Sequence, residues 1–201
     1  MRSLPANQRA RIRLLQLGAV LLSIPLMTMS PAFWRDGSDT VEHIGVVLVL
    51  LCVAGRMWSI LYIGAKKNRE LMTVGPYSMT RNPLYFFSML GAAGIGLFVG
   101  SLVLAFMSAL FVYLVLVATA GKEAAHLEAL FGEQYREYAR RTPLFWPKPS
   151  LYREVDDIAF SPVALRRTFL DGLLFLAALP AIELVEYLKE TDYIPIFFEL
   201  L

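Results

Sequence analysis

The chain has 201 residues, of which 57% are hydrophobic and 18% charged, with a formal net charge of +2. Soluble domains are closer to half apolar and a quarter charged, so an ordinary soluble domain is disfavoured. The small net charge argues against a nucleic-acid partner, and the single cysteine, Cys52, excludes an internal disulfide and a cysteine-rich metal site. Runs of roughly 20 residues that carry almost no charge are long enough to cross a bilayer, and they predict one integral membrane domain over 1–201.

The first two apolar segments are expected to be spanning helices. The segment from about 12 to 34 begins at a basic leader with arginines at positions 2, 9, 11 and 13. This layout resembles a signal peptide, but the sequence at 29–32 is a poor cleavage site, so we expect a retained helix. The second helix is expected over about 41–63. Within it, Arg56 is a charge at a depth where charges are costly, so it either has a function or extends its side chain to the interface.

The next two apolar segments are expected to form a helical hairpin. The third helix is predicted over 83–99, and it starts with a proline, whose missing N–H is harmless in a first turn. A Gly-Ser turn at 100–101 then leads into a fourth helix that ends near Gly121. The small residues at 91–96 are expected to pack closely against a neighbouring helix. A dinucleotide motif is disfavoured there because no strand precedes them.

The chain after the hairpin changes character. Residues 122–141 have an amphipathic pattern, which predicts a helix that leaves the membrane or lies along it. Prolines exclude a regular helix over 142–149, and the aromatic residues there suit the headgroup region. A last apolar stretch, 165–188, is interrupted by charges and by Pro180. This stretch leaves two alternatives, a fifth spanning helix and a re-entrant or interfacial helix.

The distribution of lysine and arginine indicates the topology. Basic residues gather in the leader, in the loop 64–82 and in 122–148, whereas the loop 35–42 is mostly acidic. Because positive loops stay on the cytoplasmic side, the N-terminus and both basic segments are expected in the cytoplasm. The predicted fold is therefore all-α: a polytopic transmembrane helical bundle of four to five spans with a cytoplasmic amphipathic segment.

The stretch 75–85, Gly-Pro-Tyr-Ser-Met-Thr-Arg-Asn-Pro-Leu-Tyr, is a candidate binding site. A guanidinium, an amide and two phenols gather where a helix begins. The free N–H groups and partial positive charge of a helix N-terminus favour an anion such as a carboxylate. The competing interpretation is an ordinary loop, in which Arg81 sets the topology and the tyrosines anchor the interface.

A second candidate cluster follows the expected hairpin. Glu123 and His126 lie at i, i+3 on one helix face. Di-iron bundles need two such Glu-x-x-His pairs and further carboxylates, so no metal site is expected here. Glu123 is either a hydrogen-bond acceptor or counter-charge at the membrane boundary, or a solvated glutamate at a helix end.

Taken in order, these residues resemble the isoprenylcysteine carboxyl methyltransferase family and its relatives, the phospholipid N-methyltransferases. The family pattern is Gly-Pro-Tyr, then Arg-His/Asn-Pro-x-Tyr at a helix start, a helical hairpin, Glu-Glu-x-x-Leu, Phe-Gly-x-x-Tyr-x-x-Tyr and a proline-bearing tail. The match covers a methyltransferase core at 41–148, and 149–201 form a C-terminal extension with an additional apolar helix. The matching residues are Gly75, Pro76, Tyr77, Arg81, Asn82, Pro83, Tyr85, Glu123, Leu127, Phe131, Gly132, Tyr135, Tyr138, Pro143 and Pro147.

The resemblance implies that S-adenosylmethionine binds in a cytoplasm-facing pocket closed by the amphipathic segment. Arg81 would meet the carboxylate of the cofactor, and Glu123 would contact the cofactor or orient the acceptor. His126 would be the base if the acceptor must lose a proton. The implied cofactor-binding residues are Tyr77, Arg81, Asn82, Pro83, Tyr85, Glu123, Leu127, Tyr135 and Tyr138.

The implied function is methyl transfer to a lipophilic or amphiphilic acceptor that enters from the lipid bilayer. It is most like protein-S-isoprenylcysteine carboxyl O-methylation, with phospholipid N-methylation and small-thiol S-methylation as alternatives. Asn82, Phe87 and Ala124 depart from the family pattern, so a non-catalytic membrane scaffold that keeps the fold is a further alternative. The expected location is a bacterial inner membrane with a cytoplasmic active site, and the oligomeric state is left open.

Overall fold

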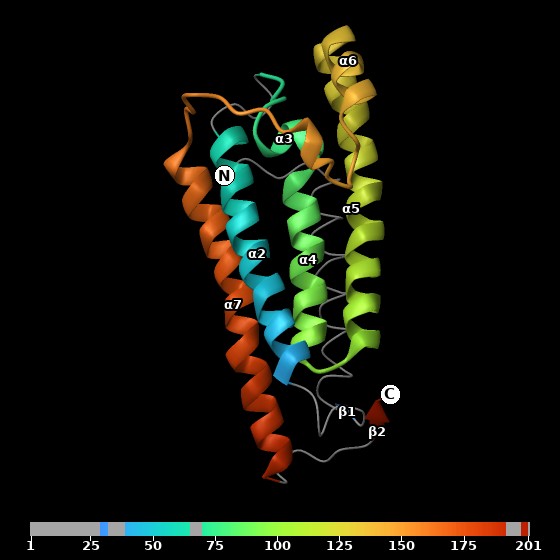
Figure 1. The fold of residues 1–201 in the computed structure, drawn as a ribbon, viewed down its shortest axis with the longest axis vertical. Helices are drawn as coiled ribbons and strands as arrows, with labels where there is room; N and C mark the ends of the chain where they lie inside the picture. Colours follow the sequence, from blue (N-terminus) through green and yellow to red (C-terminus); the bar gives the residue numbers. More distant parts are fainter. Residues whose placement is uncertain (1–28, 32–38, 65–69, 192–197, 201) are drawn as a thin grey trace, which may run out of the picture.

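The computed structural model describes residues 29–31, 39–64, 70–191 and 198–200. Four long helices stand side by side, and short helices cover one end of them, which we call the upper end (Figure 1). The elements in chain order are β1 (Met29–Pro31), α2 (Asp39–Ile63), α3 (Pro76–Met79), α4 (Pro83–Phe98), α5 (Leu102–Phe131), α6 (Glu133–Arg141), the 3₁₀ turn η1 (Pro149–Leu151), α7 (Pro162–Glu190) and β2 (Phe198–Leu200).

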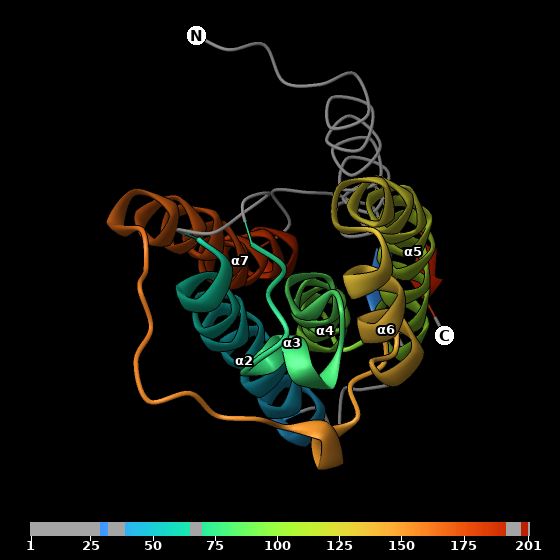
Figure 2. The same ribbon diagram turned by 90° about the horizontal axis from the view of Figure 1, so that it is seen from above.

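Helix α4 lies at the centre of the bundle. It packs against α2 on one side and α5 on the other, and α7 packs against α2 (Figure 2). Glycines allow the close approach of α4 to its neighbours: a Cβ on Gly94 would lie 2.7 Å from the carbonyl oxygen of Gly45, and one on Gly96 would lie 2.3 Å from the backbone of Ala105. The prediction that the small residues at 91–96 serve helix packing is confirmed.

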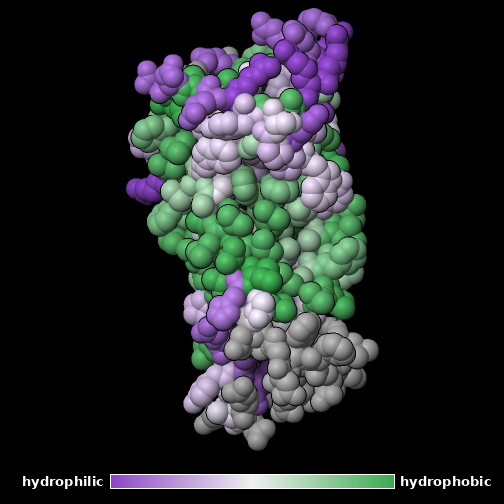
Figure 3. All heavy atoms as spheres, in the orientation of Figure 1, coloured by the Kyte–Doolittle hydropathy of each residue, from purple (hydrophilic) through white to green (hydrophobic). Residues whose placement is uncertain are grey.

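Three of the described helices are long and apolar enough to cross a membrane: α2, α5 and α7. Helix α4 is apolar but has 16 residues. Val47, Phe106 and Leu174, on the outer faces of the three long helices, are each more than half exposed, as expected for side chains that face lipid. A hydrophobic band crosses the bundle below a hydrophilic upper end (Figure 3). The stretch 165–188 therefore lies in a helix able to span the bilayer.

The expected first helix is wrong at its end. It was predicted to reach Trp34, but Met29–Pro31 is a short strand that pairs in parallel with Phe198–Leu200. Pro31 lacks an N–H and suits a strand that has a partner on one side. The rest of that segment, the basic leader and the loop residues 65–69 lie outside the described residues. This two-stranded pair is the one departure from the all-α prediction within the described chain.

The expected end of the fourth helix at Gly121 is also wrong. Helix α5 continues to Phe131, and its 30 residues extend about 45 Å, well beyond a hydrocarbon core of about 30 Å. Strong helix formers follow Gly121 and carry the helix through it. The helix ends at Gly132, whose φ of 57° is a left-handed conformation that glycine adopts without strain.

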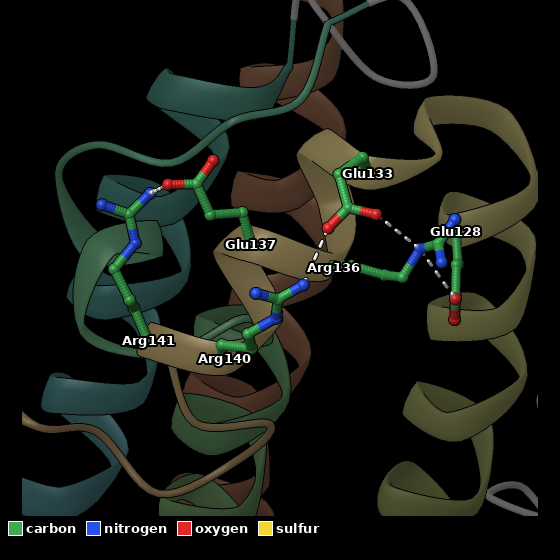
Figure 4. A network of polar contacts seen from close by, with 6 residues as sticks. All are labelled: Glu128, Glu133, Arg136, Glu137, Arg140 and Arg141. Carbon is green, nitrogen blue, oxygen red and sulfur yellow. Dashed lines mark hydrogen bonds and ion pairs between the residues drawn. The ribbon is translucent and has the colours of Figure 1, made fainter.

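Several ion pairs lie on the surface where α5 meets α6 (Figure 4). Arg136 reaches Glu128 at 3.5 Å and Glu133 at 3.3 Å, across the break at Gly132. These side chains are half exposed or more, so each pair contributes about 0–1 kcal/mol. The corner is therefore set by the backbone of Gly132 more than by its charges.

Candidate active site

Two segments that carry parts of the family pattern are joined at the upper end. Residues 79–82, just before α4, run beside residues 143–148, which follow α6. Four hydrogen bonds of 2.9 Å connect them: Arg81 N to Pro143 O, Thr80 Oγ1 to Phe145 O, Asn82 Nδ2 to Leu144 O, and Lys148 N to Met79 O. These bonds bring two segments together that are separated by the whole α4–α5 hairpin in the sequence.

Apolar packing holds the same junction from below. Phe145 is buried with Met89 of α4 and Leu116 of α5, and Tyr85 packs against this cluster. Phe145 also meets the ring of Tyr113 edge to face, with 4.8 Å between centroids. The proline-bearing tail therefore inserts an aromatic side chain between α4 and α5, which fixes the height of 143–148 on the bundle.

Helix α6 is tied to α3 through a buried tyrosine. The hydroxyl of Tyr138 donates to the backbone carbonyl of Tyr77 at 2.6 Å. Burial raises the pKa of Tyr138, and it raises the pKa of Tyr77 well above its ordinary value, with smaller contributions from neighbouring groups that include Glu123. Both hydroxyls are therefore neutral at physiological pH.

Arg81 lies beneath α6. Its Nη1 donates to the hydroxyl of Tyr135 at 3.2 Å, and its guanidinium carbon is 5.9 Å from the centre of that ring. Its Nε is buried and has no hydrogen-bond partner within the described part of the chain. We call Tyr77, Arg81, Asn82, Tyr135 and Tyr138 the Arg81 cluster. It joins a cation with an unused donor to three buried tyrosines.

The remaining predicted site residues lie at the same end with different degrees of contact. Glu123 is half-buried in the upper part of α5, close enough to Tyr77 for its charge to affect the tyrosine pKa. Leu127 is half-buried one turn further on, whereas His126 is exposed. Pro83 is buried at the start of α4, as predicted. The structure thus brings Glu123 toward the Arg81 cluster and leaves His126 on the outside.

A hollow of about 410 Å³ adjoins the cluster. It lies between α3, α6 and the segments 71–73 and 151–153, and Tyr138 forms part of its wall. Its described lining includes neither Arg81 nor Glu123. Its wall is part polar and part apolar, and the charged residues that line it are Glu137, Arg141 and Arg153.

A second polar group lies among the apolar parts of the long helices. Arg56 of α2 donates through Nη1 to the hydroxyl of Ser88 in α4, and its Nη2 is 3.8 Å from a carboxylate oxygen of Asp171 in α7. Arg56 therefore reaches across the bundle, which argues against extension along α2 to the interface. Two opposite charges within apolar segments were a signal for this pair, but their separation in the sequence hid it.

No metal site is evident among the described residues, which contain no group of three or more His, Cys, Asp or Glu side chains that could hold an ion.

Comparisons with known proteins identify relatives over most of the chain. Residues 41–134 match a family described as phospholipid methyltransferase. The chain is 33% identical over 182 residues to the nickel-cobalt-cadmium resistance protein NccN of Alcaligenes xylosoxydans xylosoxydans, which covers 89% of this chain and 85% of that protein. It is 38% identical over 146 residues to the cobalt-zinc-cadmium resistance protein CzcN of Cupriavidus metallidurans. This match covers 73% of this chain and 67% of that protein. No solved structure matches the chain significantly.

Proposed function

The chain belongs to the phospholipid methyltransferase family, and from this premise we propose that it transfers a methyl group from S-adenosylmethionine to an amphiphilic acceptor in the membrane. The observation that supports the proposal is the Arg81 cluster, in which family-pattern residues distant in sequence meet at the upper end. The bias of Lys and Arg favours a cytoplasmic location for this end. We propose a bacterial inner membrane as its setting.

The residues of the cluster fit the cofactor. The buried Nε of Arg81 lacks a hydrogen-bond partner in the described chain, and such a donor costs about 1–3 kcal/mol unless a ligand satisfies it. A carboxylate would satisfy it, and the start of α4 at Asn82 and Pro83 adds a partial positive charge. The faces of Tyr135 and Tyr138 suit a sulfonium cation. When bound, S-adenosylmethionine would supply an electrophilic methyl group and its own leaving group.

The chain itself would supply alignment and exclusion of water. The four hydrogen bonds between 79–82 and 143–148 hold Arg81 and Asn82 in place, and Phe145 closes the junction toward the bilayer. Glu123, Tyr85 and Leu127 are proposed to line the donor side, with Glu123 accepting a hydrogen bond from donor or acceptor. His126 is the proposed base for an amine or thiol, and its exposure on α5 would let it pass a proton to solvent.

Methyl labelling of membranes tests this proposal. Membranes that contain the chain would be incubated with methyl-labelled S-adenosylmethionine, and the lipid and protein fractions would be counted. Alkali releases the label of a methyl ester as methanol and leaves an N-methyl or S-methyl group in place, so one treatment separates the carboxylate acceptor from the others. Labelling no greater than in membranes with Arg81→Ala would contradict the proposal.

The names of the relatives favour a second proposal, which concerns the cellular process that the chain serves. We propose that the chain contributes to resistance to divalent transition metals. In a host without the gene, growth in cadmium would be compared after return of the wild-type chain or Arg81→Ala. Rescue by the wild type alone links resistance to catalysis. Equal rescue by both supports the alternative of a non-catalytic scaffold, and rescue by neither removes the proposed role.

A further inference from the structure

Arg56 is held within the hydrophobic band by contacts from two other helices. Its guanidinium donates to Ser88 of α4, lies 3.8 Å from Asp171 and 5.8 Å from the ring centre of Phe175, both on α7. The Arg56 side chain is 17% exposed, whereas that of Asp171 is 66% exposed. A partly buried cation thus meets an anion that is exposed on the outer surface of the bundle.

The positive charge of Arg56 is incompletely compensated. Its distance to Asp171 exceeds the roughly 2.8 Å of a charge-assisted hydrogen bond. Ser88 is neutral and uses its own proton on the carbonyl of Leu84. The Nε of Arg56 is buried without a hydrogen-bond partner in the described chain. At a depth where an uncompensated charge is costly, such a guanidinium is suited to bind a further anion.

Helix α7 is attached by apolar packing as well as by this ion pair. A Cβ on Gly172 would lie 3.2 Å from Val53, and one on Gly91 would lie 2.8 Å from the ring of Phe175. Close apolar packing therefore joins α7 to α2 and α4 in the turn that follows Asp171. The long Arg56–Asp171 contact adds little to this packing, which leaves it free to serve another purpose.

We propose that Arg56 binds the anionic group of the membrane-borne acceptor, and that Asp171 is the counter-ion displaced when the acceptor arrives. The inference rests on the proposed function and gives the C-terminal extension 149–201 a part in it. Because Asp171 is open on the outer surface, an amphiphile can reach Arg56 from the bilayer beside α7, without passing through the upper end.

The depth of Arg56 indicates which group of the acceptor it binds. Its partner Ser88 follows Asn82 by six residues, which is about 9 Å along α4. An anion at Arg56 would therefore be a different group from the nucleophile at the Arg81 cluster. The anion would lie nearer the bilayer centre, and a short spacer would join it to the nucleophile. This spacing favours a lipid phosphate with its nucleophile beyond it, and disfavours an acceptor whose single carboxylate must itself react.

Charged amphiphiles with one dodecyl chain test the site. The full chain, purified in the uncharged detergent dodecyl maltoside, would be titrated with dodecyl phosphate, dodecanoate or dodecyltrimethylammonium, and thermal stability would be followed. We expect dodecyl phosphate to bind and the ammonium compound not to. Arg56→Gln should lower the affinity for dodecyl phosphate at least tenfold. Arg56→Lys, which keeps the positive charge but loses the paired N–H donors of the guanidinium, should lower it less.

Asp171→Asn separates a displaceable counter-ion from a structural ion pair. Removal of a competing carboxylate should preserve or increase the affinity for dodecyl phosphate. A loss as large as that of Arg56→Gln would overturn the inference, as would unchanged affinity in Arg56→Gln or Arg56→Lys. If dodecanoate binds as tightly as dodecyl phosphate, and its binding also depends on Arg56, Arg56 is an anion site but the assignment to phosphate is overturned.

Binding of S-adenosylhomocysteine to each variant reports on the donor side. A variant that still binds S-adenosylhomocysteine is folded. The same measurement distinguishes failure of this inference from failure of the proposed methyl transfer. If Arg56→Gln does not fold, Arg56→Lys and Asp171→Asn still give the two opposite results that decide the question.

Discussion

The hydroxyl of Tyr138 donates a 2.6 Å hydrogen bond to the backbone carbonyl of Tyr77, and this bond fixes α6 over α3. Both residues are buried, so no water replaces the bond if it is lost. Because Arg81 lies beneath α6 and contacts Tyr135 of the same helix, the position of α6 also determines how much of the guanidinium is covered.

Tyr138→Phe should destabilise the chain. The change leaves the Tyr77 carbonyl buried without its partner, which costs about 1–3 kcal/mol. The melting temperature in detergent should fall, and affinity for S-adenosylhomocysteine should fall with it. Tyr187→Phe is the matched control, since Tyr187 is 60% exposed on α7. Equal melting temperatures for the two variants would contradict the role given to the Tyr138 bond.

Two glycine substitutions should have opposite effects. Gly94→Ala places a Cβ 2.7 Å from the carbonyl oxygen of Gly45 and 2.9 Å from Leu48, so α2 and α4 must separate at a cost of about 1–3 kcal/mol. A Cβ on Gly121 meets nothing within 4 Å, so Gly121→Ala should stabilise α5 by up to about 1 kcal/mol. Melting temperatures measured side by side test this difference, and a lower value for Gly121→Ala would show that α5 does not continue through this residue.

Stability should decrease at alkaline pH. Burial raises the folded-state pKa of Tyr77 and Tyr138, so the folded chain keeps protons that the unfolded chain releases above about pH 10. Their contribution to stability is therefore complete below this pH and is lost as pH rises through the folded pKa values. Melting temperatures from pH 8 to 11.5 measure it. The decline should be less steep in Tyr138→Phe, and an identical decline would exclude Tyr138 as a source.

The apolar segments predicted much of the fold. The helix over 41–63, the helix beginning at Pro83 and the turn at 100–101 are confirmed. Each depends on local chemistry: a mostly apolar run, a proline in a first turn, and a glycine with a φ of 78° at Gly100. The end near Gly121 was wrong because an exposed glycine does not stop a helix whose next residues strongly favour helix.

The candidate site was predicted less completely. The family pattern named the residues of the Arg81 cluster, but their joining depends on backbone carbonyls of Pro143, Leu144 and Phe145, which carry no sequence signal. Arg56 was recognised as a costly charge, but its contact with Asp171 requires the packing of α7 against α2. Non-local packing of this kind is visible only in the structure.

The binding of S-adenosylhomocysteine to the purified chain decides whether the Arg81 cluster belongs to a methyl-donor site. We predict that the ligand raises the melting temperature of the wild type by mass action. Arg81→Ala should lower the affinity for the ligand by about 10- to 100-fold, or about 1.4–2.8 kcal/mol. Arg140→Ala, which removes an exposed arginine of α6, should leave this affinity unchanged. No rise at millimolar ligand, or an unchanged affinity in Arg81→Ala, would contradict the assignment.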